Sequence, residues 1–327
     1  MTLRNGAGAT VAQGTLRLAR GAHIAKFLDQ LAPDFVMLSS VIFDGLGSLE
    51  IAADQPVSVM ALRLTINQRG DLLMTTTPIA DLGRQMPAGT LSLPQIADGG
   101  GYQTTIILMN TSNATESGTV RFYGNDGAPL AVRMADGGAA GTQFPYTIPA
   151  GGFLRLVTDG SPAEVEAGWA QLTRDAGSAA PVGAAIFGYT RGTVLVTETG
   201  VAATTATTHA RIYVDQSGGH DTGIAVVNPG NSPLRITATA YALDGITPAG
   251  NGPGTVDLAL LGHAAKFTWQ FIEGLPEGFT GVLDVRSADP FAALTLRSLY
   301  NWRRDFLMTT FPVADVNQAP PGRIIFP

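Results

Sequence analysis

Histidine is the first side chain to test for catalysis or metal binding, because it titrates near neutral pH and ligates metals. The chain has four: His23, His209, His220 and His263. No two of them have the spacing of two or four residues that is typical of a zinc site. His23 and His263 each stand three residues before a lysine. This shared setting indicates a repeated structural position at a strand edge or turn, so we expect no metal site.

His220 is followed directly by Asp221, and these two residues could supply part of a catalytic triad. The nucleophile is missing, because the chain has no G-x-S-x-G elbow and no serine in a strand-to-helix turn. It also has no cysteine, which excludes thiol nucleophiles, thiolate zinc sites and disulfides. We therefore expect no serine or cysteine hydrolase.

Two glycine-rich loops, residues 98–101 and 215–219, recur at the same repeat position. A loop that binds phosphate needs a helix behind it to supply N–H groups and a favourable dipole. A β-branched strand follows here instead. Calcium requires six to eight oxygen ligands, and each loop begins with a single aspartate. Both loops are predicted to be turns, and no cofactor is expected.

A pair of carboxylates could hydrolyse a glycosidic bond even from distant parts of the sequence. The candidates are Glu164, Glu166, Glu198 and Asp175. All four stand in polar stretches that are predicted to be solvated, and the sequence offers no means of pairing them. We therefore interpret them as surface charges and expect the protein not to be an enzyme.

The candidate ligand-binding residues are Tyr300, Trp302 and Arg303, in a predicted loop between two strands. Large rings on an exposed loop can stack on sugars or anchor a protein partner. The corresponding loop of the first repeat, residues 66–70, has no ring. The alternative is that Trp302 folds back over the end of its sandwich, which the rarity of fully exposed tryptophan favours. The other two tryptophans, at positions 169 and 269, are expected to be structural.

The composition of the 327-residue chain excludes several classes of protein. Apolar residues make up 45% and charged residues 14%, so the chain can build substantial cores. A net charge of −6 with no cluster of basic residues argues against nucleic acid as a partner. No apolar run approaches the roughly 18 residues that span a membrane. The start of the chain lacks the apolar segment of a signal peptide.

The strongest pattern in the chain is an internal repeat. Residues 306–316 match residues 72–82 at seven of eleven positions, 234 residues apart. A second match relates 106–110 to 224–228, at a shift of 118. Each copy contains about seven short runs that alternate in the strand manner, with turns every 8–12 residues. Helical turns are expected only near 27–31 and 269–274. The predicted fold class is all-β, with tandem immunoglobulin-like antiparallel β-sandwiches.

The repeats predict four segments. Residues 1–88 form a partial sandwich whose opening strands are missing, with Asn5-Gly6 on the hairpin turn occupied by Asp126-Gly127 in the next copy. Residues 89–206 and 207–317 form complete sandwiches. Residues 318–327 are the opening strand of a further repeat, or a strand donated to the open first sandwich of another chain. Strand donation would build a head-to-tail filament. The competing interpretation is that Met1 begins a fragment of a longer protein.

Residues 222–229 and 304–310 resemble the β-sandwich repeats of large secreted or surface proteins of bacteria. The resemblance implies an extracellular or cell-surface location and a structural or adhesive role without catalytic residues. The implied partners are other copies of the chain or neighbouring repeats. The alternative function is a carbohydrate-binding module attached to an extracellular enzyme, with polysaccharide as its ligand.

Overall fold

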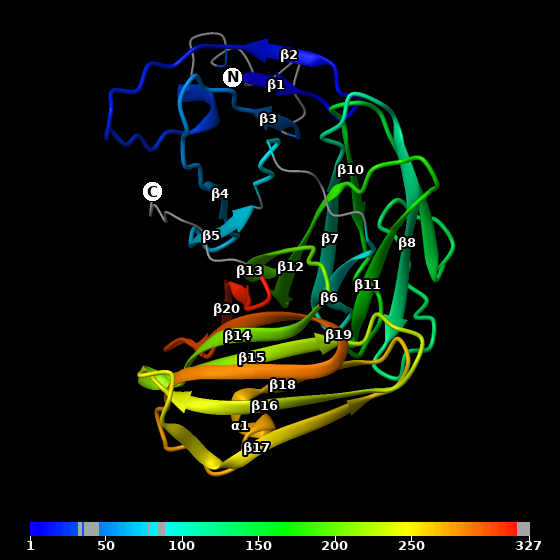
Figure 1. Ribbon diagram of the computed structural model, residues 1–327. Helices are drawn as coiled ribbons and strands as arrows, with labels where there is room; N and C mark the ends of the chain where they lie inside the picture. The colour runs from blue at the N-terminus through cyan, green and yellow to red at the C-terminus, as the bar shows by residue number, and fades with distance from the viewer. Residues whose placement is uncertain (32–34, 36–45, 78, 84–88, 319–327) are drawn as a thin grey trace.

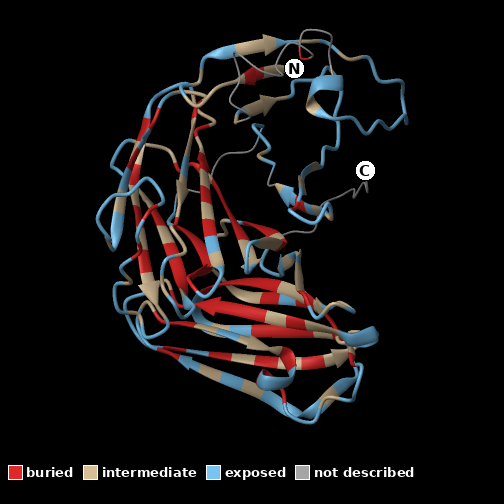
Figure 2. Cartoon of the chain, turned by 180° about the vertical axis from the view of Figure 1, so that it is seen from behind, coloured by how far each residue is buried: buried red, intermediate tan, exposed pale blue. Residues whose placement is uncertain are grey.

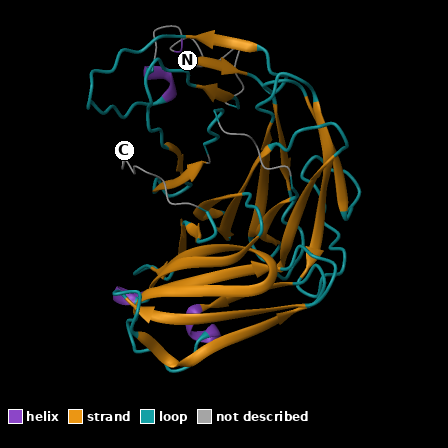
Figure 3. Ribbon diagram, in the orientation of Figure 1, coloured by secondary structure: helices purple, strands orange, loops and turns teal. Residues whose placement is uncertain are grey.

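The computed structural model describes residues 1–31, 35, 46–77, 79–83 and 89–318. It is built almost wholly of antiparallel strands and turns (Figure 3), with 55% strand and 4% helix, so the all-β prediction is confirmed. The described residues contain three named helical turns: Leu28–Gln30 (η1) and Thr268–Phe271 (α1), which lie at the two predicted places, and Ser217–Gly219 (η3), which was expected to be a turn. Within the described residues, no helix has the length and apolarity needed to cross a membrane.

The middle part of the chain, here called unit 2, folds into two four-stranded sheets. Their strand orders are β6-β11-β8-β9 and β10-β7-β12-β13. The strands are β6 (Leu91–Asp98), β7 (Tyr102–Met109), β8 (Glu116–Gly124), β9 (Gln143–Ile148), β10 (Phe153–Val157), β11 (Glu166–Arg174), β12 (Val182–Arg191) and β13 (Val194–Ala202).

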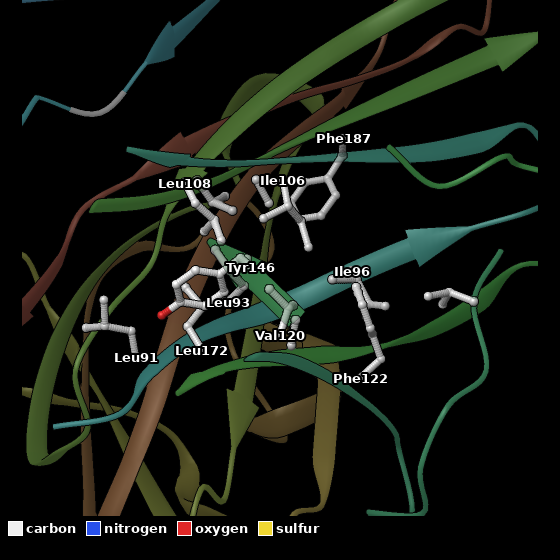
Figure 4. Close-up of a cluster of buried hydrophobic side chains, with 14 of the residues drawn as sticks. Leu91, Leu93, Ile96, Ile106, Leu108, Val120, Phe122, Tyr146, Leu172 and Phe187 are labelled. Carbon is white, nitrogen blue, oxygen red and sulfur yellow. The ribbon is translucent and has the colours of Figure 1, made fainter. Parts of the chain in front are cut away.

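Alternation along the strands creates the core of unit 2. On β7, Ile106 and Leu108 are buried, whereas the residues that follow each of them, Ile107 and Met109, are partly exposed, because successive side chains point to opposite faces. The buried faces of both sheets meet in one cluster around Phe122 (Figure 4). Each fully buried large aliphatic or aromatic side chain of this kind contributes about 1.5–3 kcal/mol through removal from water.

The following part, unit 3, repeats the strand order of unit 2. Its sheets are β17-β16-β19-β14-β21 and β18-β15-β19-β20, where β19 belongs to both. The strands are β14 (Thr207–Asp215), β15 (His220–Val227), β16 (Leu234–Ala242), β17 (Pro248–Leu258), β18 (His263–Phe267), β19 (Thr280–Tyr300), β20 (Phe306–Phe311) and β21 (Val313–Asp315).

Strand β19 departs from the sequence prediction. Two separate short strands were expected, at 281–285 and 292–296, but one strand of 21 residues runs through both sheets. In unit 2 the corresponding strands β11 and β12 are separated by a loop that contains Gly177 at a φ of 89°. Residues 286–291 of unit 3 contain no glycine. The chain there continues extended from one sheet into the other.

The first part of the chain, unit 1, has far fewer pairings. Strand β1 (Thr2–Arg4) pairs with β2 (Thr10–Gln13) and β3 (Ser48–Glu50), and β4 (Ala61–Ile66) pairs only with β5 (Leu72–Thr77). Its buried cluster is small, built on Leu3 and Phe35. Six apolar side chains of unit 1 are expected to lack partners because the opening strands of the sandwich are missing. Unit 1 is largely exposed (Figure 2): Leu16 is partly exposed, and the exposed side chains are Leu18, Ile51, Val59, Leu62 and Leu64.

The three units follow a C-shaped curve (Figure 1). The β4–β5 hairpin lies inside the curve, against β13 of unit 2. There the Thr75 hydroxyl accepts a hydrogen bond of 2.7 Å from the Gly200 amide. Strand β20 of unit 3 also contacts β13, and the Thr199 hydroxyl donates to the Met308 carbonyl at 2.7 Å. All three units therefore meet at β13.

The junction between units 1 and 2 is made by two turns. The Phe153 amide at the start of β10 donates to the Gly6 carbonyl in the turn between β1 and β2, at 3.1 Å. The Ser48 hydroxyl donates to the Gly151 carbonyl at 3.4 Å. Unit 1 therefore presents a hairpin turn to the turn that precedes β10 of unit 2.

The junction between units 2 and 3 repeats this arrangement. The His263 amide at the start of β18 donates to the Asn125 carbonyl in the turn between β8 and β9, at 3.0 Å. The Trp169 indole donates to the Leu261 carbonyl at 2.8 Å. Trp169 is fully buried, with its ring stacked on Tyr123 at a centroid distance of 5.1 Å. In both junctions, the hairpin turn of one unit thus contacts the turn that precedes the corresponding strand, β10 or β18, of the next unit.

Glycine is required at one position in each of these junctions. Gly8 and Gly127 have φ values of 80° and 83°, and a Cβ there would lie 2.0 and 2.1 Å from a carbonyl oxygen of the next unit. Gly8 therefore corresponds to Gly127, and the prediction that Gly6 occupies this position was wrong. The reason is that the turn spans residues 5–9, in which the Gly8 amide donates to Asn5.

Candidate functional site

Of the predicted ligand-binding residues, Trp302 and Arg303 lie in the loop between β19 and β20, and Tyr300 is the last residue of β19. Trp302 is 86% exposed and Tyr300 is 67% exposed, so the expectation that Trp302 folds back over the sandwich was wrong. The Arg303 guanidinium lies over the indole at 5.1 Å from the ring centroid and is itself held by carboxylates. The indole therefore stands out from the loop with the guanidinium against its face.

Arg303 belongs to a crossed set of ion pairs between units 1 and 3, here called the arginine–aspartate clamp. It consists of Arg69, Asp71, Arg303 and Asp305. Arg69 Nη2 donates to Asp305 at 2.8 Å, and Arg303 Nη2 donates to Asp71 at 2.9 Å. Each arginine also places its Nε near the aspartate of its own loop, at 3.1 and 3.2 Å. Each aspartate is thus shared by both arginines.

One sequence pattern positions the clamp in both loops. Residues 67–71 and 301–305 both read Asn-x-Arg-x-Asp. In each loop the asparagine side-chain oxygen accepts hydrogen bonds of 2.9 Å from the backbone amides of the arginine and the aspartate. This local bonding fixes a tight turn that points both side chains the same way. The sequence interpretation missed the clamp, although the shared pattern lies just before the 234-residue match.

The electrostatics of the clamp favour binding over catalysis. The hydrogen bond from Arg69 is the largest cause that lowers the pKa of Asp305, whose side chain is almost fully buried. The pKa of Asp71 is lowered first by the Asn67 amide and then by the arginines. Both carboxyls are therefore ionised at neutral pH, and neither can donate a proton.

Unit 2 also reaches the clamp. Arg191, the last residue of β12, places its Nη1 3.8 Å from Asp305 and donates to the Arg304 carbonyl at 3.5 Å. Three arginines and two aspartates meet here, so the cluster has an excess of positive charge. Loops from all three units are tied together at this point.

Aromatic rings lie on the strands next to these loops. Tyr102 and Tyr189 of unit 2 lie 4.6 Å apart between ring centroids, and Tyr300 lies 5.0 Å from Phe306. Burial raises the pKa of Tyr102 to about 12, and the nearby tyrosines at 189 and 300 act in the same direction. Rings beside guanidinium donors suit a sugar with acidic groups, because rings stack on the sugar and arginines bind carboxylates or sulfates.

The possible His220–Asp221 pair does not form a catalytic dyad. The His220 Nδ1 lies 2.8 Å from the Ser217 carbonyl oxygen, whereas Asp221 accepts from the Trp269 indole at 2.8 Å. His209 lies 2.8 Å from the buried Asp284, whose carboxylate also binds two arginines. His209 therefore belongs to an ion-pair network around Asp284. Among the described residues, no group of three or more histidine and acidic side chains could hold a metal.

His263 is buried inside the junction between units 2 and 3. Its Nδ1 lies 2.7 Å from the Asn125 side-chain oxygen, and its Nε2 lies 3.0 Å from the Gln95 side-chain oxygen. Burial lowers the pKa of His263 to about 4. A neutral imidazole has one N–H donor and one acceptor nitrogen. The His263 ring therefore donates to the oxygen of one amide and accepts from the NH₂ group of the other, after that amide group is flipped. The expected edge or turn position is thus a buried contact between units.

The four carboxylates considered for glycoside hydrolysis are not brought together as a pair. Glu164 and Glu166 are exposed, and Asp175 accepts from a serine hydroxyl at 2.7 Å. The expectation of solvation was wrong for Glu198, which accepts from Thr65 at 2.6 Å and is mostly buried under the β4–β5 hairpin. The adjoining cavity, about 100 Å³, has room for only a few water molecules.

Comparison of the chain with family models, with curated proteins and with solved structures finds no match. No activity, ligand or partner can therefore be transferred from a relative. The features that bear on function are the two repeated junctions, the clamp that ties the three units together, and the exposed rings beside it.

Proposed function

We propose that the chain is a non-enzymatic structural or adhesive module, a tandem array of immunoglobulin-like β-sandwiches in a bacterial surface or secreted assembly. The observation that carries the proposal is the repeated junction. In both junctions, a hairpin turn of one unit contacts the turn before β10 or β18 of the next unit. The backbone hydrogen bond between the two turns is 3.1 Å in the first junction and 3.0 Å in the second. A contact that recurs between successive units indicates how further repeats would stack.

The equal strand orders of units 2 and 3 support the same proposal, because each unit offers its neighbour the same surfaces. The titratable groups support a structural role. Asp71 and Asp305 are saturated by arginines, His263 lies inside a junction, and Glu198 lies under a hairpin. The proposed location, extracellular or at the cell surface, rests on the resemblance of the repeats. Residues 324–326, the strand proposed for donation to another chain, lie outside the described residues.

A load-bearing role is tested by pulling the chain between its ends in an optical trap. We expect two discrete unfolding events, each of which releases the length of one complete unit. The substitution Leu108→Ala, inside the core of unit 2, should lower the force of one event only. Extension without a resisting event would contradict the structural role.

Exposed rings beside arginines favour a second candidate function, the binding of acidic polysaccharide at Tyr300, Trp302 and Arg303. Loss of one stacked ring costs about 0.5–1.5 kcal/mol, so Trp302→Ala should weaken retention on an insoluble acidic polysaccharide by about two- to tenfold. The matched control is Trp269→Ala, which removes another exposed indole far along unit 3. Equal retention of both variants and the parent chain would remove this site.

A further inference from the structure

The hairpin turn at the far end of unit 3 contacts no other unit among the residues that the structure describes. It spans residues 242–247, and the Gly245 amide donates to the Ala242 carbonyl at 2.8 Å. The corresponding bond of the turn in unit 2 is 3.1 Å, from Gly127 to Gly124. Gly245 has a φ of 68°, but no described atom lies within 4 Å of where its Cβ would be. The surface used in both junctions is therefore open here.

This open turn is more apolar than its counterpart in unit 2. Leu243 is 67% exposed and Ile246 is 78% exposed. Leu243 stands where unit 2 has Asn125, the residue that contacts His263 in the next unit. Exposed aliphatic side chains at the tip of a hairpin gain nothing from water and indicate a contact surface.

The strands behind the turn are apolar as well. Tyr241 and Val282 lie opposite each other across β16 and β19, as Tyr123 and Trp169 do across β8 and β11. In unit 2 this cross-strand pair packs against Leu261 of the next unit. The apolar surface of Tyr241, Leu243, Ile246 and Val282 is here called the end face of unit 3.

Unit 1 carries the other half of the junction, and no other unit contacts it within the described part of the chain. In the turn at residues 19–22, the Ala22 amide donates to the Ala19 carbonyl at 3.0 Å, and Gly21 has a φ of 73°. The turns that receive a neighbour in units 2 and 3, residues 149–152 and 259–262, have the same bond at 2.9 and 3.0 Å. Their third residues likewise have positive φ, 67° at Gly151 and 53° at Leu261.

The chain thus presents one unoccupied copy of each half of a junction that it forms twice internally. Residues 17–27 around the receiving turn are all exposed. The receiving turn lies on the open side of the C, and so does the end of β16 that leads into the free turn of unit 3 (Figure 1). The two surfaces differ, so the contact between them is heterologous.

We propose that the end face of unit 3 docks onto the turn at residues 19–22 of a second copy of this chain. The geometry of the internal junctions assigns the contacts. The His23 amide of the second copy donates to the Leu243 carbonyl, as Phe153 does to Gly6 and His263 does to Asn125. Leu243 and Ile246 are covered by the receiving turn. The proposal rests on the proposed function of the chain as a structural repeat module.

Disulfide trapping tests this contact cleanly, because the chain has no cysteine. One protein carries Leu243→Cys and a second carries His23→Cys, both at exposed positions. Mixed under mild oxidation, the two should form a crosslinked dimer much faster than either does alone. The matched control replaces Leu243→Cys with Val165→Cys, an exposed apolar position on unit 2.

Three outcomes would overturn the proposal. They are equal trapping in the control mixture, equal trapping in either protein alone, and, for a chain that carries both substitutions, a disulfide formed only within one chain. Each shows that the end face does not recognise the receiving turn of a second copy.

Light scattering against concentration provides an independent measurement on the full chain. We expect the parent chain to form dimers or longer assemblies, and Leu243→Asp to raise the concentration required by about tenfold or more. Val165→Asp should leave that concentration unchanged. A parent chain that stays monomeric at every concentration would overturn the docking contact, whereas the unfolding events of units 2 and 3 under force would be unaffected. The two proposals can therefore fail separately.

Discussion

Acidification should weaken the junction between units 2 and 3 through His263. The pKa of this buried imidazole is about 4, against an ordinary value of 6.5. Between these values the unfolded chain binds a proton that the folded chain does not, so stability falls as pH falls. This contribution is complete above about pH 6.5 and is lost progressively down to pH 4. From the two pKa values, the loss between pH 7 and pH 5 is about 2 kcal/mol.

Urea unfolding at pH 7 and pH 5 measures this loss, with the fluorescence of the buried Trp169 as the signal from the same junction. The comparison is with His263→Gln, which keeps a hydrogen-bonding side chain and cannot titrate. We expect the parent chain to lose about 2 kcal/mol more than the variant between the two pH values. Equal losses in both proteins would refute the assignment of the pH dependence to His263.

The carboxylates do not obscure this window. Asp215 has its pKa lowered to about 2 by Ser217 and Arg297 against the opposing effect of burial, and the pKa of Asp305 is lowered by Arg69. A carboxyl group whose pKa is lowered in the folded state stabilises the fold at pH values above its unfolded pKa, near 3.8. This stabilisation is lost only as the pH falls below that value. Burial raises the pKa of Asp98, so its protonation opposes acid unfolding. The comparison of the parent chain with His263→Gln at each pH therefore isolates the contribution of His263.

Three further substitutions test the contacts between units. Asp305→Asn should free the β4–β5 hairpin and speed protease cleavage within residues 61–77 by roughly two- to fivefold; an unchanged rate would show that the clamp does not hold it. Gly200→Ala places a Cβ 2.3 Å from the Thr76 carbonyl oxygen and should cost about 1–3 kcal/mol in urea unfolding, unless β5 shifts freely. Trp169→Phe removes the donor to Leu261 and should cost about 1 kcal/mol, and no loss would mean that water replaces the bond.

Local patterns in the sequence predicted most of the strands. The run at residues 104–109 is β-branched and apolar and forms most of β7, and Asp126-Gly127 forms a hairpin turn as expected. These features depend on neighbouring residues only. The continuous strand β19 was not predicted, because its two halves bury faces in two different sheets and each half alone reads as a short strand.

Contacts between units were beyond the reach of local patterns. Asn67 and Asn301 head the same five-residue pattern, but nothing in either loop shows that the two loops meet. Asn5-Gly6 was placed on this turn by counting back along the repeat. The decisive constraint on Gly8 is the carbonyl oxygen of Ala150, which belongs to the next unit.

The match between residues 72–82 and 306–316 has a structural reason. These segments contain β5 and β20, and both strands contact the same strand, β13. Threonine hydroxyls make the contacts: Thr75 of β5 accepts from the Gly200 amide at 2.7 Å, and Thr310 of β20 donates to the Gly200 carbonyl at 3.3 Å. On β13 itself, Thr197 accepts from the Met308 amide at 3.1 Å. The side chains of a threonine-rich strand can hydrogen-bond to the backbone of a neighbouring strand without joining its sheet. Strands β5, β13 and β20 can therefore meet here without competing for one sheet edge. The shared sequence therefore follows from a shared neighbour as well as from a shared fold.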